Sequence, residues 1–416
     1  MIDKILRSLD GASKGEAAAA LLTLQDFSKA FDRQDATLAV QSFQDNGVRP
    51  SLIPLLISFF EGRQMTVKWH GVRSGLRDLP GGSPQGASMG LWSFLSQTND
   101  NPEDSKSDEI FKFVDDKSVI EVINLFSIGL ASHNVKATVP SNIPVSNIFI
   151  PSEHLKTQEN MEKVQSWTEK KKMKLNVKKT KNLVFNFSRN NQFSTAVTMG
   201  NEVVETVKET KLLGTVLTDN LSWNKNTDKI VKETNKRMQL LHKVSKFTNN
   251  TRDLKQIYML QIRSKLDQSA VLWHSSLTKK NRDDLERVQK SAVKCILGSK
   301  YQSYENGLEE IGLETLEKRR DQMCLKFAKQ CLKIDKMKQF FGKNDSGHSM
   351  LKRDSNSFKV VRAHTERFRK SAIPSMIRML NIYESGKRRV LKQLDPSVPV
   401  NYGCISPYRC DNDKQK

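Results

Sequence analysis

The chain has 416 residues, of which 37% are hydrophobic and 27% are charged, and its 68 Lys and Arg against 46 Asp and Glu give a formal charge of +22. This length predicts two to four domains with a real core, and the basic balance favours a polyanionic partner, nucleic acid or an anionic membrane surface, over a merely basic protein. Five scattered cysteines indicate a reducing compartment, and the lack of a signal-peptide start or a run near 20 apolar residues makes secretion or a membrane span unexpected.

The first part of the chain mixes strand and helix patterns. The run AALLTL predicts a strand that ends at Asp26, and DATLAVQSFQDNG and SLIPLLISFFEGR each predict a helix. QMTVKWHG alternates, which predicts a strand with Met65, Val67 and Trp69 on one side. A loop rich in glycine and proline, LPGGSPQGASMG, then leads into a helix over LWSFLSQTND.

The stretch EIFKFVDDKSVIEV predicts a hairpin with its turn at DDK, and an irregular insertion over residues 131–155 follows. A helix over NMEKVQSWTEKKKMK and a strand over NLVFNF complete an α+β order. From KETKLLGTVLTD onward the pattern becomes mostly helical. One stripe at helical spacing consists of Ile230, Thr234, Met238, Leu241 and Val244.

Three carboxylates stand where chemistry is possible: Asp26 at the end of a predicted strand, and Asp115 and Asp116 at the predicted hairpin turn. If these strands are neighbours in one sheet, the carboxylates converge and raise one another's pKa values, a cost that a divalent cation offsets. Mg²⁺ prefers such hard oxygen ligands, and two ions can support phosphoryl transfer. Each feature alone is more often a solvated turn or a plain strand end, so the hypothesis rests on their combination with the glycine-rich loop and the basic charge.

Five segments, in this order, resemble motifs A to E of reverse transcriptases. They are DFSKAFD (26–32), GGSPQG (81–86), FVDD (113–116), MKLNVKKT (173–180) and KLLGTVLTD (211–219). The likeness is greatest to the non-long-terminal-repeat, LINE-like retrotransposons, and it spans about residues 20–380. Any one motif is weak, whereas five in order are specific.

The resemblance implies a catalytic centre on Asp26, Asp115 and Asp116, which would bind Mg²⁺ (or Mn²⁺) together with the backbone carbonyl of Phe27. Phe31 would lie under the incoming sugar, where a bulky ring clashes with a 2′-hydroxyl and selects deoxynucleotides. On the residues alone, without the motif context, a core aromatic is the favoured interpretation of Phe31.

The resemblance also implies contacts to nucleotide and primer. Gln85 offers a donor and an acceptor to the nucleotide, and Gly86 permits close backbone approach. Lys179 would face the leaving pyrophosphate, and Leu213 and Gly214 would form the primer grip. The helical region after residue 220 would hold the template–primer duplex through its phosphates. Basic residues near its first helix are Lys225, Lys229, Lys232, Lys236 and Arg237.

The implied fold is α+β, a right-hand polymerase palm with an antiparallel sheet and packed helices, followed by a mostly α-helical thumb and C-terminal region. The expected regions are a palm with residual fingers over residues 1–200, a primer grip and helical thumb over 201–300, and a helical C-terminal region with a flexible basic tail over 301–416. Since 25 residues precede Asp26, where the family has a fingers region, we expect an N-terminally truncated reading frame with weak or no activity of its own. Gln25 also replaces the apolar residue common before the first Asp.

The implied function is RNA-directed DNA polymerisation onto a primer 3′-hydroxyl, with an RNA template, a DNA primer and deoxynucleotide triphosphates as partners. The alternative is a catalytically inactive, nucleic-acid-binding remnant. An RNA-directed RNA polymerase, in which Asp32 would be a second acidic residue of the first motif, is a third possibility, although Phe31 and the FVDD hairpin favour the deoxynucleotide enzyme. The resemblance implies an intracellular setting, nucleus or cytoplasm, without a membrane partner, and leaves the oligomeric state open.

Overall fold

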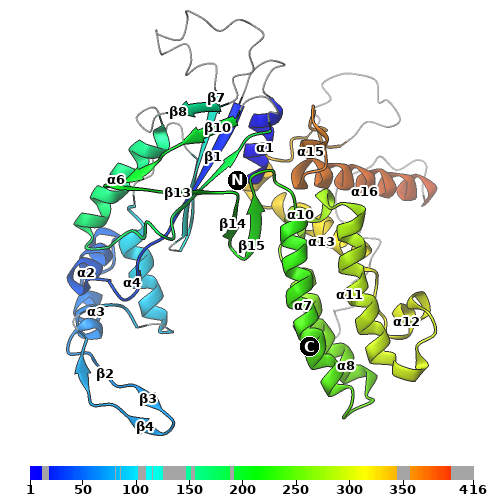
Figure 1. The fold of residues 1–416 in the computed structure, drawn as a ribbon, viewed down its shortest axis with the longest axis horizontal. Coiled ribbons are helices and arrows are strands. Elements are labelled where there is room, and N and C mark those ends of the chain that lie inside the picture. The colour runs from blue at the N-terminus through cyan, green and yellow to red at the C-terminus, as the bar shows by residue number, and fades with distance from the viewer. Residues whose placement is uncertain are drawn as a thin grey trace, which may run out of the picture. The chain divides into compact units, whose positions relative to one another are not determined.

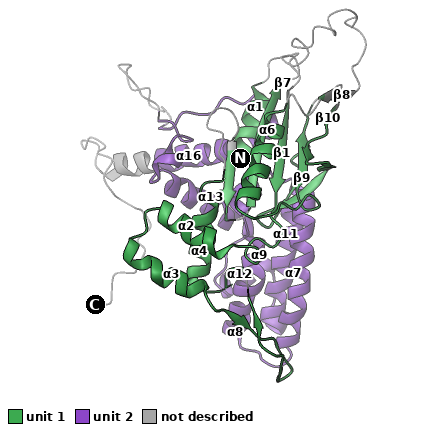
Figure 2. Ribbon diagram, turned by 90° about the vertical axis from the view of Figure 1, so that its left-hand side faces the viewer, with its two compact units in different colours: residues 1–222 green, residues 223–416 purple. Residues whose placement is uncertain are grey.

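A computed structural model describes residues 1–11, 18–79, 81–84, 86–101, 109–114, 116–124, 147–150, 155–187, 192–343 and 357–394. The chain divides into two compact units, Met1–Ser222 and Trp223–Lys416 (Figure 2). Among the described helices, none combines the length and the apolar character that crossing a membrane requires.

The first unit is built on a five-stranded sheet with the strand order β13-β9-β1-β7-β6 (Figure 1). Its neighbouring strands pair antiparallel, except β13 with β9. The strands are β1 (Ala18–Gln25), β6 (Glu109–Phe113), β7 (Asp116–Asn124), β9 (Lys181–Phe185) and β13 (Glu205–Val207). The predicted strand that ends at Asp26 is thus β1, and its apolar run suits a central strand that is covered on both faces.

Three helices contact this sheet or share its core. Helix α1 (Ile2–Asp10) contacts β1 and β7, while α4 (Ser88–Thr98) and α6 (Lys156–Lys170) contribute to one hydrophobic core with the sheet. Members of this core are Ala19, Leu21, Phe94, Ile123, Val164 and Trp167. The mixed α+β class is confirmed for this unit, with helices packed on a small, mainly antiparallel sheet.

The two helices predicted after Asp26 are both present. Helix α2 (Ala36–Asp45) is capped by Asp35, whose carboxylate accepts a hydrogen bond from the backbone N–H of Leu38 at 3.0 Å. It ends before Gly47, which has φ +80° as the sequence predicts for a helix terminator. Helix α3 (Ile53–Phe60) follows a short 3₁₀ turn.

The predicted strand QMTVKWHG forms one side of a narrow β-ribbon instead of a strand of the main sheet. Strands β2 (Gln64–Met65) and β3 (Lys68–Trp69) pair with β5 (Arg77–Asp78) and β4 (Val72–Arg73) respectively. Its apolar side chains do not pack into a core, and Trp69 is 73% exposed.

Short strand pairs complete the first unit. They are β8 (Asn147–Ile150) with β10 (Gln192–Thr195), β11 (Thr198–Met199) with β12 (Glu202–Val203), and β14 (Glu209–Leu212) with β15 (Thr215–Thr218).

The second unit is mostly helical in its described part, as predicted for the region after residue 220. The stretch KETKLLGTVLTD, from which the sequence predicts the helical pattern, instead forms strands β14 and β15. Its longer helices are α7 (Asn224–Val244), α8 (Thr251–Ile257), α11 (Lys279–Leu297), α12 (Tyr304–Glu310), α13 (Leu316–Cys331) and α16 (Ala372–Leu394), and its shorter ones are α9 (Ser264–Leu266), α10 (Ala270–Trp273), α14 (Asp335–Lys338) and α15 (Glu366–Arg369). The predicted stripe on α7 is buried at Ile230, Thr234, Met238 and Leu241. Cys295, Cys324 and Cys331 are free thiols, and Cys404 and Cys410 lie outside the described residues.

Candidate active site

The strand register brings Asp26 and Asp116 to the same edge of the sheet. The last antiparallel pair between β1 and β7 joins Gln25 to Lys117. Asp26 follows Gln25 and Asp116 precedes Lys117, so both aspartates adjoin the last residue pair of this ladder. The predicted condition for convergence, that the two strands are neighbours, is therefore met.

The predicted hairpin is also present and ends at this edge, but its turn is not at DDK, because Asp116 pairs with Phe113 and Lys117 pairs with Lys112 within the two strands. Strands β6 and β7 pair from Glu109 with Ile120 to Phe113 with Asp116. Between the last pair, Val114 has φ +58°, a left-handed conformation that tight hairpin turns require. Asp115 lies outside the described residues.

The backbone of Asp26 is fixed on its other side by the segment after helix α6. The Asp26 carbonyl accepts a hydrogen bond from the backbone N–H of Asn176 at 2.8 Å, and its N–H donates to Thr180 Oγ1 at 3.4 Å. Phe27 forms an antiparallel bridge with Leu175. The peptide that carries the first predicted metal ligand is thus held between strand β7 and residues 174–180.

The carboxylate of Asp26 retains coordinating capacity. Its Oδ2 is buried and accepts no hydrogen bond from a described residue, and its one ion pair is with Lys179 Nζ at 3.6 Å. A buried oxygen without a donor is costly unless a cation occupies it, and a carboxylate oxygen is a ligand that Mg²⁺ accepts. The residues present therefore fit a divalent cation, although within the described residues no three His, Cys, Asp or Glu side chains form a metal-binding group.

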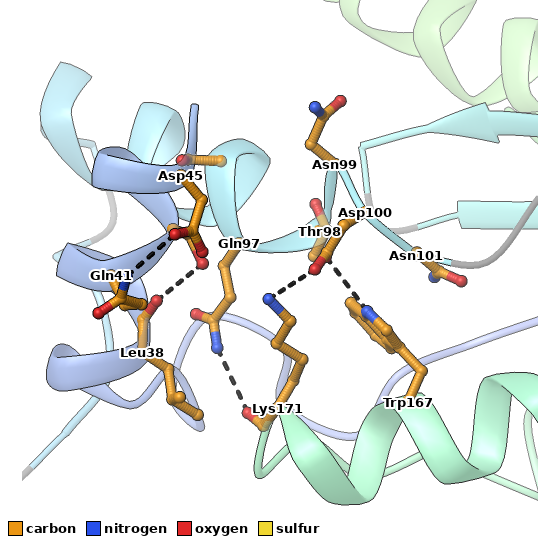
Figure 3. Close-up of polar contacts among 12 residues, drawn as sticks. Leu38, Gln41, Asp45, Gln97, Thr98, Asn99, Asp100, Asn101, Trp167 and Lys171 are labelled. Carbon is orange, nitrogen blue, oxygen red and sulfur yellow. Dashed lines mark hydrogen bonds and ion pairs between the residues drawn. The ribbon is translucent and has the colours of Figure 1, made fainter. Parts of the chain in front are cut away.

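Hydrogen bonds and an ion pair join the end of helix α6 to the residues at the end of α4. Asp100 accepts a hydrogen bond from Trp167 Nε1 at 3.2 Å and pairs with Lys171 Nζ at 2.8 Å, and Gln97 donates to the Lys171 carbonyl at 3.3 Å (Figure 3). The Trp167 ring lies 6.1 Å from the ring of Phe27, centroid to centroid. The chain continues from Lys171 to Leu175 and Asn176, so these contacts position the segment that borders Asp26.

Phe31 lies against the glycine-rich loop. Its carbonyl accepts a hydrogen bond from the N–H of Ser83 at 2.8 Å, and the Gly82 N–H donates to the carbonyl of Gln34 at 2.8 Å. The ring of Phe31 is partly buried and stacks on Phe94 with a centroid separation of 4.4 Å. Phe31 thus packs into the core through its ring, and it also lies next to the glycine-rich loop.

Glycine is required in this loop for the reason the sequence suggests. Gly82 has φ +84°, and a Cβ there would lie 3.0 Å from the carbonyl oxygen of Asp32. Gly86 has φ +89° and is exposed, while Gln85 lies outside the described residues. Arg63, which the sequence did not single out, donates to the carbonyls of Gly81 and Gly82 at 3.2 and 2.6 Å.

The last residue pair of β1 and β7, next to Asp26 in the chain, is polar and buried. Gln25 is 2% exposed, and its Nε2 donates to Asn160 Oδ1 at 3.4 Å. Its cross-strand neighbour Lys117 is also 2% exposed and donates to Asn101 Oδ1 at 3.1 Å. The polar residue before the first aspartate is therefore accommodated by polar neighbours from distant segments.

Leu213 and Gly214 form the turn of a second hairpin. Strands β14 and β15 end with the pair Leu212 and Thr215, and the turn residues have φ +45° and +84°. Leu213 is 52% exposed although it is apolar. The predicted primer-grip residues thus occupy an exposed hairpin tip in the first unit.

The predicted basic residues of the second unit all lie on helix α7. Lys225, Lys232 and Lys236 are exposed, and the last two line an open hollow of about 390 Å³ beside Asp284 of α11. Arg237 instead donates to the backbone carbonyl of Gln261. Its guanidinium is thus engaged within this unit.

Eight chains of solved structures match this chain. No protein-family model and no curated protein matches the chain. Telomerase from Candida tropicalis, solved in complex with the TWJ fragment of telomeric RNA, is similar with a TM-score of 0.33 and 12% sequence identity over 94% of this chain and 51% of that one. The chain spans about half the length of that telomerase chain, and a likeness at this level establishes neither a shared fold nor a shared activity.

Proposed function

We propose that residues 1–200 are the palm, with residual fingers, of a reverse transcriptase of the LINE-like group, an RNA-directed DNA polymerase acting in the nucleus or cytoplasm. The observation that carries this proposal is the register of β1 and β7, whose last pair, Gln25 with Lys117, places Asp26 and Asp116 at the same edge of the sheet. The buried Oδ2 of Asp26, which accepts no hydrogen bond from a described residue, gives independent support, since it is suited to a hard cation.

Asp26, Asp115, Asp116 and the carbonyl of Phe27 would hold the metal ions. When bound, Mg²⁺ (or Mn²⁺) activates the primer 3′-hydroxyl and stabilises the leaving oxygen in nucleotidyl transfer. The protein's own contribution is to fix the Asp26 backbone through Asn176 and Thr180, because a catalytic carboxylate must be held in place before the reaction.

The incoming deoxynucleotide would lie between Phe31 and the glycine-rich loop. Phe31 would exclude a 2′-hydroxyl, Gln85 and Gly86 would contact the nucleotide, and Lys179 would neutralise its phosphates. The hydrogen bond between the Phe31 carbonyl and the Ser83 N–H supports this arrangement, because it joins the two parts of the pocket.

Primer and template would be held by the remaining regions. Leu213 and Gly214 would support the primer 3′ end, and the exposed lysines of α7 would contact the phosphates of the duplex. In this scheme residues 1–200 form the palm, 201–300 the primer grip and thumb, and 301–416 the helical C-terminal region.

The test is primer extension on an RNA template with Mg²⁺ or Mn²⁺ and deoxynucleotide triphosphates. Asp26→Ala and Asp115→Ala should each lower extension by at least about 100-fold, because each removes a metal ligand, while RNA binding in a gel-shift assay stays unchanged. Asp45→Ala, at the end of α2, serves as the control and should leave extension intact.

The alternative is a catalytically inactive remnant that binds nucleic acid through its charge. It predicts RNA binding without extension by the wild-type chain under any of these conditions. Robust extension that survives Asp26→Ala and Asp115→Ala would contradict the proposed site itself.

The change Phe31→Val distinguishes a reverse transcriptase from a polymerase that makes RNA. In the deoxynucleotide enzyme this change should raise incorporation of ribonucleotides relative to deoxynucleotides, because it removes the ring under the sugar. A wild-type enzyme that prefers ribonucleotides would favour the RNA polymerase.

A further inference from the structure

Lys179 forms an ion pair with the candidate metal ligand. Its Nζ lies 3.6 Å from Oδ2 of Asp26, the oxygen that accepts no hydrogen bond from a described residue. The backbone of Lys179 is fixed, because its N–H donates to the carbonyl of Asn176 at 3.2 Å and to Asn176 Oδ1 at 3.3 Å. The position of the lysine next to Asp26 is thus set by the same turn that holds the Asp26 backbone.

The ion pair is exchangeable. The Lys179 side chain is 68% exposed and that of Asp26 is 30% exposed, and at 3.6 Å the contact is longer than a direct hydrogen bond. Pairs of this kind are weak because water and salt screen them. A ligand that binds either partner more strongly will therefore displace the other.

We propose that Lys179 is the counter-ion of Asp26 when no divalent cation is bound, so that Lys179 and the cation compete for Oδ2. This inference rests on the proposed function in one respect, namely that Asp26 is a cation ligand. Oδ2 of Asp26 cannot hold the Lys179 ammonium and a divalent cation at the same position. Cation binding at this oxygen therefore requires the lysine to move away. Lys179 then lowers the affinity of the free protein for the cation, and any anion that engages the lysine, such as a polyphosphate, raises it.

The neighbouring lysine provides a matched control. Lys178 is exposed and makes no ion pair with a described residue. Neutralising Lys178 or Lys179 changes the net charge equally and at adjacent positions, so a difference between the two isolates the ion pair from the general field of this basic chain.

The experiment is a titration of the full chain with Mn²⁺ alone, with free Mn²⁺ measured by electron paramagnetic resonance and no nucleotide or nucleic acid present. Lys179→Gln should bind Mn²⁺ about two- to fivefold more tightly than wild type, the range expected for loss of one exposed ion pair. Lys178→Gln should show less than half of that gain, and Lys179→Arg, which keeps the charge, should bind like wild type. No change in Lys179→Gln, or an equal gain in Lys178→Gln, overturns the inference.

Asp26→Asn separates this inference from the function on which it rests. If Asp26→Asn removes Mn²⁺ binding while Lys179→Gln has no effect, the competition is wrong and the metal site stands. If Asp26→Asn binds Mn²⁺ like wild type, or if neither wild type nor Lys179→Gln binds it, then Asp26 is not a cation ligand and both proposals fail.

Discussion

Glu121 joins the central sheet to helix α6 through its buried carboxylate. It is 7% exposed and accepts hydrogen bonds from the N–H groups of Lys156 and Thr157 at 3.1 and 2.9 Å and from Thr157 Oγ1 at 2.7 Å. The first N–H groups of a helix have no partner within the helix. Glu121→Ala should therefore lower the free energy of unfolding by about 2–4 kcal/mol, measured by urea denaturation.

The control for this change is Glu159→Ala on the same helix. Glu159 is exposed and pairs with Lys163 one turn later at 2.6 Å, so its loss should cost no more than about 0.5 kcal/mol. Equal effects of the two changes would show that Glu121 does not cap α6.

Asp35 makes a pH-dependent contribution at the start of α2. Burial raises its pKa, but hydrogen bonds from Lys172 and from the backbone N–H of Leu38 outweigh burial, so the pKa lies below its ordinary value of 3.8. A carboxyl whose pKa is lowered in the folded state stabilises that state above the unfolded pKa, and this stabilisation is lost as pH falls through the folded pKa. Asp35→Asn keeps a helix cap but loses the charge pair, so it should cost up to about 1 kcal/mol at pH 7, and this cost should shrink as the pH falls below 3.8. A cost that does not change as the pH falls would assign the effect to the cap instead.

Single residues differ in how far the sequence predicts their place. Asp26 is predictable because an apolar run ends there, and Gly82 and Gly86 because a tight loop needs positive φ. Thr180 and Glu121 are not, because their partners, Asp26 and Thr157, are distant in the sequence or belong to another element. Arg63 gives no local signal either, since its role depends on the carbonyls of Gly81 and Gly82.

At the scale of elements, helix α4 and the glycine-rich loop approach so closely that one position admits only glycine. A Cβ on Gly90 would lie 2.2 Å from the carbonyl oxygen of Pro84 and 2.9 Å from Ser83 Oγ. The first of these is backbone and cannot rotate away, so Gly90→Ala should cost about 1–3 kcal/mol despite the higher helix propensity of alanine. The measurement is urea denaturation, with primer extension as a second readout because the loop would be displaced.

Gly75→Ala, in the ribbon, is the matched control for Gly90→Ala. A Cβ at Gly75 meets no atom within 4 Å, so this change should leave stability within about 0.5 kcal/mol of wild type. A tolerated Gly90→Ala would mean that the loop and the helix separate without loss.

Local pattern predicts which segments are strands or helices, but not which strands become neighbours. The β6–β7 hairpin follows from sequence proximity, whereas the pairing of β1 with β7 and β9 brings together segments separated by long stretches. The ribbon shows a different limit: Met65, Val67 and Trp69 alternate like a half-buried strand, yet they stay exposed because nothing in the described part of the chain packs on them.

At the scale of the whole molecule, the change from an α+β to a helical pattern coincides with the division into two compact units after Ser222. The sequence pattern places this change slightly early, at KETKLLGTVLTD, where β14 and β15 still lie. It also does not show that residues 223–416 form one unit instead of two regions. That grouping depends on contacts such as those of α13 with α16 and of α7 with α11.

This division predicts that residues 223–416 fold on their own. They have a separate hydrophobic core that includes Cys324, Phe341 and Ile377, and Tyr258 and Tyr304 are joined through the buried Gln289 side chain at 2.6 and 2.8 Å. The isolated fragment should unfold cooperatively in urea with loss of helical circular dichroism.

Burial raises the pKa of the Cys324 thiol to about 12, whereas in the urea-denatured fragment its pKa is near 8.5. At pH 8 this cysteine should therefore react with iodoacetamide on the order of a thousandfold more slowly in the folded fragment than in the denatured one. Gradual unfolding together with rapid labelling of Cys324 would show instead that this unit needs residues 1–222 to fold.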